Sequence, residues 1–266
     1  MDHPAAQDAP APEFAAAPVR ALSPADLRWA LAEGWDDFRE LRGDLLFLPL
    51  VYAAIGFVAA AMALRRDLFP LVFPLAAGFA LVGPVAAAGF YEIARRREEG
   101  LPTSWRHFFD PLAGRSRVPL IFLAAGLAGL FLLWVAVAQA IYGATLGTLQ
   151  LAGPAEFLAA LTTTPEGLRM ILVGNLVGAG FALAALVVAA FSFPMVVDRG
   201  TDPIAAVLTS ARVFATSPMT MLRWGAMVAA ILLIASLPLF MGLVVALPVL
   251  GYATWHLYTR AVVRTP

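Results

Sequence analysis

The amino-acid sequence predicts an all-α membrane protein with six transmembrane helices and two or three amphipathic helices at the cytoplasmic surface. Of the 266 residues, 61% are hydrophobic and only 14% are charged, which is far more apolar than a typical soluble domain. The apolar residues also form runs of about 20, the length of helix that crosses a bilayer. Lipid is therefore the expected solvent for most of the chain.

The apolar runs divide the chain into a tail and one membrane domain. The predicted spans cover about residues 45–64, 68–91, 118–142, 168–191, 219–236 and 238–259, inside a single domain of residues 23–262. Residues 1–22 are rich in Ala and Pro and lack the charged start and apolar core of a signal peptide, so they are expected to form a disordered tail. Residues 263–266 form a short C-terminal tail.

The arginines orient these spans. With six spans, the segments on the side of the two termini contain 15 of the 18 basic residues, all of which are arginine. One such group, Arg95, Arg96 and Arg97, directly follows the second span. Because basic residues accumulate on the cytoplasmic side, both termini are expected in the cytoplasm.

Residues 24–44 predict the first amphipathic helix. Ser23 and Pro24 form a start signal, and Asp26 lies in the first turn. Six acidic residues against three arginines favour contact with protein over contact with anionic lipid. Residues 92–117 have the opposite bias, so the two segments are either docking partners or two solvated charged faces. The expected apolar stripe consists of Leu27, Leu31, Trp35, Phe38, Leu41 and Leu45.

Two further amphipathic segments are expected on the same surface. Residues 104–110 present Trp105, Phe108 and Phe109 as apolar anchors. Asp202 and Pro203 form the start signal of the other helix. Its expected apolar side consists of Ile204, Val207, Leu208, Ala211 and Phe214.

Two matching blocks suggest a weak parallel internal repeat. Asp26, Ala30 and Phe38 align with Asp202, Ala206 and Phe214, and in each copy a Gly precedes a Pro by six residues in a later span. A coincidence explains the match equally well, because Gly and Pro are common in membrane helices. The residues expected to bend or pack the spans are Gly78, Pro84, Gly174, Gly178, Gly242 and Pro248.

Polar residues near the ends of the spans form the candidate functional cluster, together with one amide near mid-span. The cluster consists of Tyr91, Glu92, Asn175, Asp198, Arg199 and His256. If the spans converge, Glu92, Asp198 and His256 would form a titratable group in a partly dry environment. The more ordinary interpretation is an aromatic and ionic belt at the membrane surface. We expect no metal and no cofactor, since the chain has no cysteine, only three histidines, and no phosphate loop or nucleophile motif.

Several stretches together resemble an uncharacterised bacterial integral membrane protein family, domain of unknown function 2189. They are LAEGWDDF (31–38), GFALVGP (78–84), GFYEIARRREEG (89–100), FSFPMVVDR (191–199) and LPLFMGLVVALPVLGYATWHLYTRAV (237–262). The resemblance extends over residues 25–262. It implies a multi-pass protein of the bacterial inner (cytoplasmic) membrane, and it implies no activity or catalytic residue.

Three classes of function are compatible with these features. The favoured one is a non-enzymatic membrane component, such as an assembly, scaffold or regulatory partner. In it, the acidic helix of residues 24–44 contacts a protein partner. A small-solute transporter or channel would use the proline-broken second and sixth spans, with Asn175 near mid-membrane. An enzyme that modifies lipid at the cytoplasmic face is the third class. Nothing favours nucleic-acid binding, because the net charge is zero.

Overall fold

The computed structural model describes residues 16–45, 50, 54, 57, 72–149 and 153–264. Almost all of the predicted first span, residues 45–64, lies outside the described residues, as do the turn after it and the start of the second span. The elements are α1 (Pro24–Leu45), α3 (Val72–Glu98), η2 (Trp105–Leu112), α4 (Arg117–Gly143), η3 (Leu146–Leu149), α5 (Pro154–Thr163), α6 (Pro165–Ala189), α7 (Ser192–Arg199), α8 (Pro203–Thr216), α9 (Pro218–Ser236) and α10 (Leu243–Ala261).

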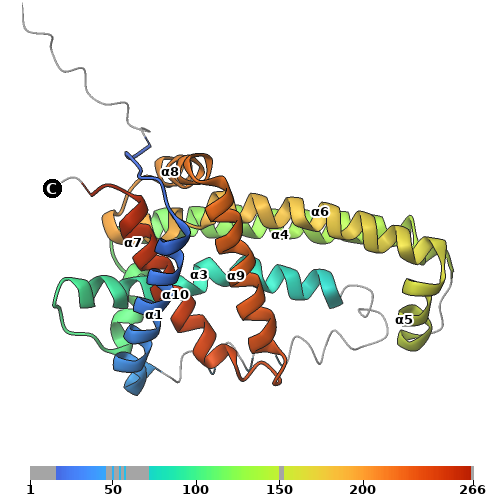
Figure 1. The fold of residues 1–266 in the computed structure, drawn as a ribbon, viewed down its shortest axis with the longest axis horizontal. Coiled ribbons are helices and arrows are strands. Elements are labelled where there is room, and N and C mark those ends of the chain that lie inside the picture. The colour runs from blue at the N-terminus through green and yellow to red at the C-terminus, as the bar shows by residue number, and fades with distance from the viewer. Residues whose placement is uncertain are drawn as a thin grey trace, which may run out of the picture.

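The longest feature of the molecule is a hairpin of α4 and α6, which lie side by side and are joined at one end through α5 (Figure 1). α4, α6 together with α7, and α9 are the described helices long and apolar enough to cross a membrane. They coincide with the predicted third, fourth and fifth spans. The all-α membrane fold is therefore confirmed, whereas six spans are not.

The remaining helices do not extend this hairpin into one parallel bundle. In Figure 1, α1, α9 and α10 run across the direction of α4 and α6. α10, which contains most of the predicted sixth span, is largely buried inside the protein. The physical reason is its composition, since Tyr252, Trp255 and Tyr258 give it large side chains that fill space between other helices.

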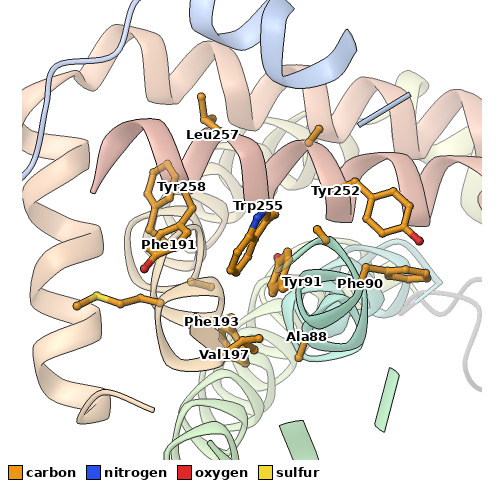
Figure 2. Packing of buried hydrophobic residues seen from close by; sticks show 14 of the residues in the cluster. Ala88, Phe90, Tyr91, Phe191, Phe193, Val197, Tyr252, Trp255, Leu257 and Tyr258 are labelled. Carbon is orange, nitrogen blue, oxygen red and sulfur yellow. The ribbon is translucent and has the colours of Figure 1, made fainter. Parts of the chain in front are cut away.

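The core lies where α10 crosses α3 and α7. Trp255 and Tyr258 are fully buried there, and Figure 2 shows Tyr91 below Trp255 and Phe191 beside Tyr258. Tyr252 meets Phe90 edge to face, with ring centroids 5.7 Å apart. Such pairs add stability beyond the apolar area that they bury. The aromatic residues expected at the membrane surface therefore form the centre of the fold.

α1 packs antiparallel along α10, because Asp26 meets Arg260 while Gly34, further along α1, meets Ala253. The contact is very close, since a Cβ atom on Gly34 would lie 2.6 Å from the backbone nitrogen of Ala253. The predicted apolar stripe is wrong at Trp35, which is 47% exposed, whereas Ala30 and Gly34 are buried. Small residues face α10 because they allow the two backbones to approach.

Residues 16–22 are ordered, although we expected them to belong to the tail. The backbone nitrogen of Arg20 donates to the carbonyl of Ala261, and Val19 pairs with Val262 in an antiparallel bridge. The Oγ of Thr220 donates to the carbonyl of Leu22. The two ends of the described chain therefore lie together, and they do so on one side of the molecule (Figure 1).

The start of α1 is held by reciprocal hydrogen bonds. The backbone nitrogen and the Oγ of Ser23 donate to the Asp26 carboxylate at 2.8 and 2.6 Å. These bonds, with help from Arg260, hold the pKa of Asp26 below its ordinary value. The predicted start signal of residues 23–26 is thus confirmed.

We expect the Asp26 contacts to stabilise the protein at neutral pH and to be lost in acid. A carboxylate whose pKa is lower in the folded state stabilises above its unfolded pKa, near 4, and loses this contribution as the pH falls through the folded pKa. Asp26→Asn should therefore lower stability at pH 7 and flatten its dependence on pH below about 4. Thermal unfolding in detergent between pH 7 and 3 measures this. Ser23→Ala should lower stability in the same window, and an unchanged acid slope in Asp26→Asn would contradict the assignment.

α8 and η2 are amphipathic, as predicted, but not all of their apolar residues face outward. In η2, Phe108 is buried against Phe90, with ring centroids 4.9 Å apart, while Trp105 and Phe109 are exposed. In α8, Ile204 and Leu208 are 47% and 46% exposed. The buried side of α8 consists of small and polar residues: Ala205, Ala206, Thr209, Ser210 and Val213.

The structure does not confirm the predicted repeat. Asp202 caps α8 and accepts from the backbone nitrogen of Ile204, whereas Asp26 lies inside α1, three residues after Ser23. α1 packs mainly on α10, but α8 packs on α6 and α7. The two copies therefore differ in the geometry of their starts and in their packing partners.

The residues predicted to bend or pack the spans have different environments. Pro84 and Pro248 lie inside α3 and α10. Gly178 contacts Trp134 of α4, since a Cβ there would lie 3.1 Å from the ring, while Gly174 has open space around it. Gly242 lies close to the backbone of Ala235 in α9. The structure does not describe the surroundings of Gly78.

Candidate functional site

Charged side chains collect where α1, α3, α7 and the last turns of α10 meet, and they divide into three networks. The first network joins α1, α3 and α10 through Asp37, which is only 3% exposed. One oxygen of its carboxylate lies 2.8 Å from Nε2 of His256, and the other lies 3.0 Å from Nε of Arg97. Arg97 also pairs with Glu40 at 2.6 Å. A buried carboxylate is thus shared between an arginine and an imidazole.

Aromatic contacts extend the first network toward solvent. The His256 ring meets Trp29 edge to face, with centroids 5.7 Å apart, and the Arg260 guanidinium lies 3.7 Å from the Trp29 ring centroid. A cation over an indole face is attracted by the ring quadrupole. Trp29 therefore helps to hold both His256 and Arg260 of α10 against α1.

The second network joins α3, α7 and α10 with the segment that follows α10. Tyr258 donates from its hydroxyl to Asp198 at 2.7 Å, and Arg264 pairs with the same carboxylate at 3.3 Å. Arg264 also bonds Glu98 at 2.7 Å, and Glu98 accepts from Nε1 of Trp255 at 3.0 Å. The end of the chain is thereby attached to the ends of α3 and α7.

The third network lies on α3 and η2. Glu92 is 4% exposed and accepts from Arg95 and Arg96, with shortest contacts of 2.7 and 2.9 Å. Arg96 also pairs with Asp110 of η2 at 2.9 Å. The arginine block after the second predicted span is therefore paired with carboxylates of the same chain, and Arg97 of this block bonds the acidic helix. The expected docking of residues 24–44 with residues 92–117 is confirmed by this contact.

The residues of the candidate cluster are distributed over these networks and beyond them. Glu92, Asp198 and His256 each bond a different set of partners, so the expected three-membered titratable group is divided. Tyr91 is buried in the aromatic core. Arg199 joins the second network, since it pairs with Asp198 at 3.5 Å and donates to the carbonyl of Val263. Asn175 lies apart, exposed on α6, where its amide donates to the carbonyl of Ile171 at 2.7 Å.

Sequence reasoning missed the residues that complete the networks, above all Asp37, Glu98 and Arg264. One signal was present for Asp37. It follows Ala30 and Gly34 by seven and three residues, so it lies on the face of α1 that packs on α10. An acidic residue on a buried helix face is normally paired. Glu98 and Arg264 lie far apart in sequence, and no local pattern connects them.

Chemically, these groups hold the helices to one another. Every carboxylate named in these networks has an arginine, a tyrosine or an imidazole as a partner, which is the arrangement that stabilises a buried charge. Within the described residues there is no group of three or more His, Asp or Glu side chains arranged to bind a metal ion.

The second network gives a direct prediction. Tyr258→Phe removes the hydroxyl that donates to Asp198 and should lower the free energy of unfolding by about 1.5–3 kcal/mol, the range for hydrogen bonds to a charged group. Tyr142→Phe, at the far end of α4, is the matched control and should change stability by less than about 0.5 kcal/mol. Unfolding in detergent by titration with sodium dodecyl sulfate measures both. Equal effects would contradict the role of Tyr258.

Residues 72–198 match the family model of domain of unknown function 2189, described as a predicted integral membrane protein. The expected resemblance is confirmed there. The match to domain of unknown function 2189 runs from α3 to the end of α7, so it includes Glu92, Arg97 and Asp198 but not α1 or α10. No curated protein and no solved structure shows a significant similarity to the chain.

The family match and the apolar helices agree on the class of protein. It is an integral membrane protein of unknown molecular activity. All three networks include residues of α3 or α7 that lie inside the match. In two of them, these residues bond α1, α10 or the segment after α10, which lie outside the match.

Proposed function

We propose that this protein is a non-enzymatic component of the bacterial inner membrane, with both termini in the cytoplasm, that acts as an assembly, scaffold or regulatory partner. The observation that carries the proposal is the use of its polar groups. The buried charges bond one another across α1, α3, α7 and α10, and the centre between these helices is filled by aromatic side chains. A rigid assembly at one end of the membrane hairpin suits a scaffold.

The position of Asn175 favours this proposal over transport. A transporter of the expected kind would line a mid-membrane cavity with Asn175 and with the backbone near Pro84 and Pro248. Asn175 is instead exposed on the outer side of α6 and bonds its own helix, and Pro248 is buried. Asn175 and Pro248 therefore do not face a common space.

The outward side of α1 is the proposed contact with a protein partner. Trp35 is 47% exposed, and the side chain of the neighbouring Asp36 is 59% exposed. Exposed aromatic residues are enriched at protein interfaces. The acidic residues of α1 that point the other way, Asp37 among them, are already used inside the chain.

The test is site-specific photo-crosslinking in intact cells. A photoreactive phenylalanine analogue at Trp35 should give an adduct of discrete mass that contains a second protein. The same analogue at Leu172, which is 71% exposed on α6, is the matched control and should react with lipid. If position 35 gives no protein adduct, and Asn175→Leu abolishes a solute flux at normal abundance, transport is the better explanation.

A further inference from the structure

The turn between α9 and α10, residues 237–242, is unusual because it is apolar and exposed. Residues 224–248 contain no charged side chain. Within the turn, Leu237, Leu239 and Met241 are 75%, 69% and 56% exposed. Turns that reach water are normally rich in Gly, Asn, Asp and Ser. The composition of this turn is that of a membrane interior.

Four amide donors of the turn bond to carbonyls of the turn itself or of the end of α9; the amide of Leu237 donates to Ile234. The amide nitrogen of Leu239 donates to the carbonyl of Leu237, that of Phe240 to Ser236, and that of Met241 to Pro238. Pro238 has no amide hydrogen to satisfy. In hydrocarbon, backbone groups have no water to bond and must find partners within the protein. A water-exposed turn is under no such requirement.

The turn adopts a rare backbone conformation. Leu239 and Phe240 have φ values of +51° and +66°, the left-handed region that residues with a Cβ atom seldom adopt. Strain of this kind persists only where the surroundings impose it. Here the two left-handed residues let the chain reverse within a few residues while their own amides stay bonded.

The place of the turn in the molecule fits a membrane interior as well. α9 and α10 have 19 residues each, which is about 28 Å of helix and slightly less than a hydrocarbon core of about 30 Å. The two helices also run obliquely, so their depth is smaller than their length. Along the axis of the α4 and α6 hairpin, the turn lies between the two ends of the hairpin, well before the end where α5 is found (Figure 1).

We propose that α9 and α10 form a re-entrant hairpin whose turn, residues 237–242, lies among the acyl chains of the bilayer and does not reach water on the opposite side. The occupant of this surface is lipid, because the turn continues the outward face of α9, where Leu233 and Ile234 are 67% and 65% exposed. The predicted fifth and sixth spans are then one excursion into the membrane. The start of α9 and the end of α10 then lie on the same side of the membrane as both ends of the described chain.

Cysteine accessibility tests this topology directly, because the chain has no cysteine of its own. Single cysteines are introduced as Leu239→Cys in the turn, Thr162→Cys in α5 and Ala32→Cys in α1. A membrane-impermeant maleimide should label Thr162→Cys in intact cells, Ala32→Cys only in inverted vesicles, and Leu239→Cys in neither. All three should be labelled after denaturation. Labelling of Leu239→Cys at the rate of Thr162→Cys would show a water-exposed turn and overturn the proposal.

A second measurement separates lipid from protein as the cover of the turn. A fluorophore on Leu239→Cys is reconstituted into phosphatidylcholine vesicles that contain nitroxide groups at shallow or deep acyl positions. Quenching should be stronger with the deep nitroxide, whereas a fluorophore on Ala32→Cys should be quenched weakly by both. If neither nitroxide quenches position 239, protein and not lipid covers the turn, and the proposal is wrong.

Discussion

Gly34→Ala is expected to lower the free energy of unfolding by about 1–3 kcal/mol, and Gly34→Leu by more, because both force α1 away from α10. The new Cβ would lie 2.6 Å from the nitrogen of Ala253 and 2.7 Å from the carbonyl oxygen of Val249. Both are backbone atoms of a buried helix, so neither can turn aside. The loss of stability is measured by unfolding with sodium dodecyl sulfate.

The matched control for Gly34 is a helical glycine with space around it. A Cβ on Gly129 of α4 would have no atom within 4 Å. Because alanine is a better helix former than glycine, Gly129→Ala should raise stability, by up to about 1 kcal/mol in a helix interior. The two substitutions are chemically identical and should act in opposite directions. Stabilisation by Gly34→Ala would show that α1 does not pack on α10 as described.

Asp37→Asn should have a similarly large effect through electrostatics. The substitution keeps the shape of the side chain but removes the charge that Arg97 and His256 share. Breaking a buried ion pair from one side costs about 3–5 kcal/mol when the remaining charge has no other partner. Here the loss should be smaller, because Arg97 is 30% exposed and keeps its pair with Glu40. Trypsin should therefore cleave after Arg97 much faster in the variant, and thermal unfolding should occur at a lower temperature.

The neighbouring residue provides the control for Asp37. Asp36 is exposed and pairs with Arg39 at 3.8 Å, and such surface pairs contribute less than about 1 kcal/mol. Asp36→Asn should therefore leave stability nearly unchanged. If Asp37→Asn and Arg97→Gln weaken the same network, the double variant should lose less stability than the sum of the two. Full additivity would mean that the two residues act independently.

The parts of the fold that the sequence predicted well are those with local signals. The caps at Ser23 and Asp202 are decided by residues within three positions, and both were predicted correctly. The long apolar helices α4, α6 and α9 follow from long apolar runs in the sequence. Hydropathy alone is sufficient there, because lipid or water is the main neighbour of each side chain.

The parts that the sequence did not predict depend on contacts between distant residues. Nothing near Gly34 shows that α10 covers it, and hydropathy counts Trp35 as a better core residue than Gly34 although Trp35 is exposed. The candidate cluster included Asp198 and His256, which lie in the last turns of α7 and α10. It did not name Asp37, Glu98 or Arg264, because each of them has a partner more than 150 residues away.

The pairing of α1 with α10 also affects the order in which the protein folds. α1 is the first described helix to leave the ribosome and α10 is the last. At about 5–20 residues per second, the roughly 200 residues between them take about 10–40 s to synthesise. During that time the face of α1 that carries Ala30 and Gly34 has no partner helix. Docking of α1 on α10 can therefore begin only after α10 has been synthesised, and until then α10 does not cover this face.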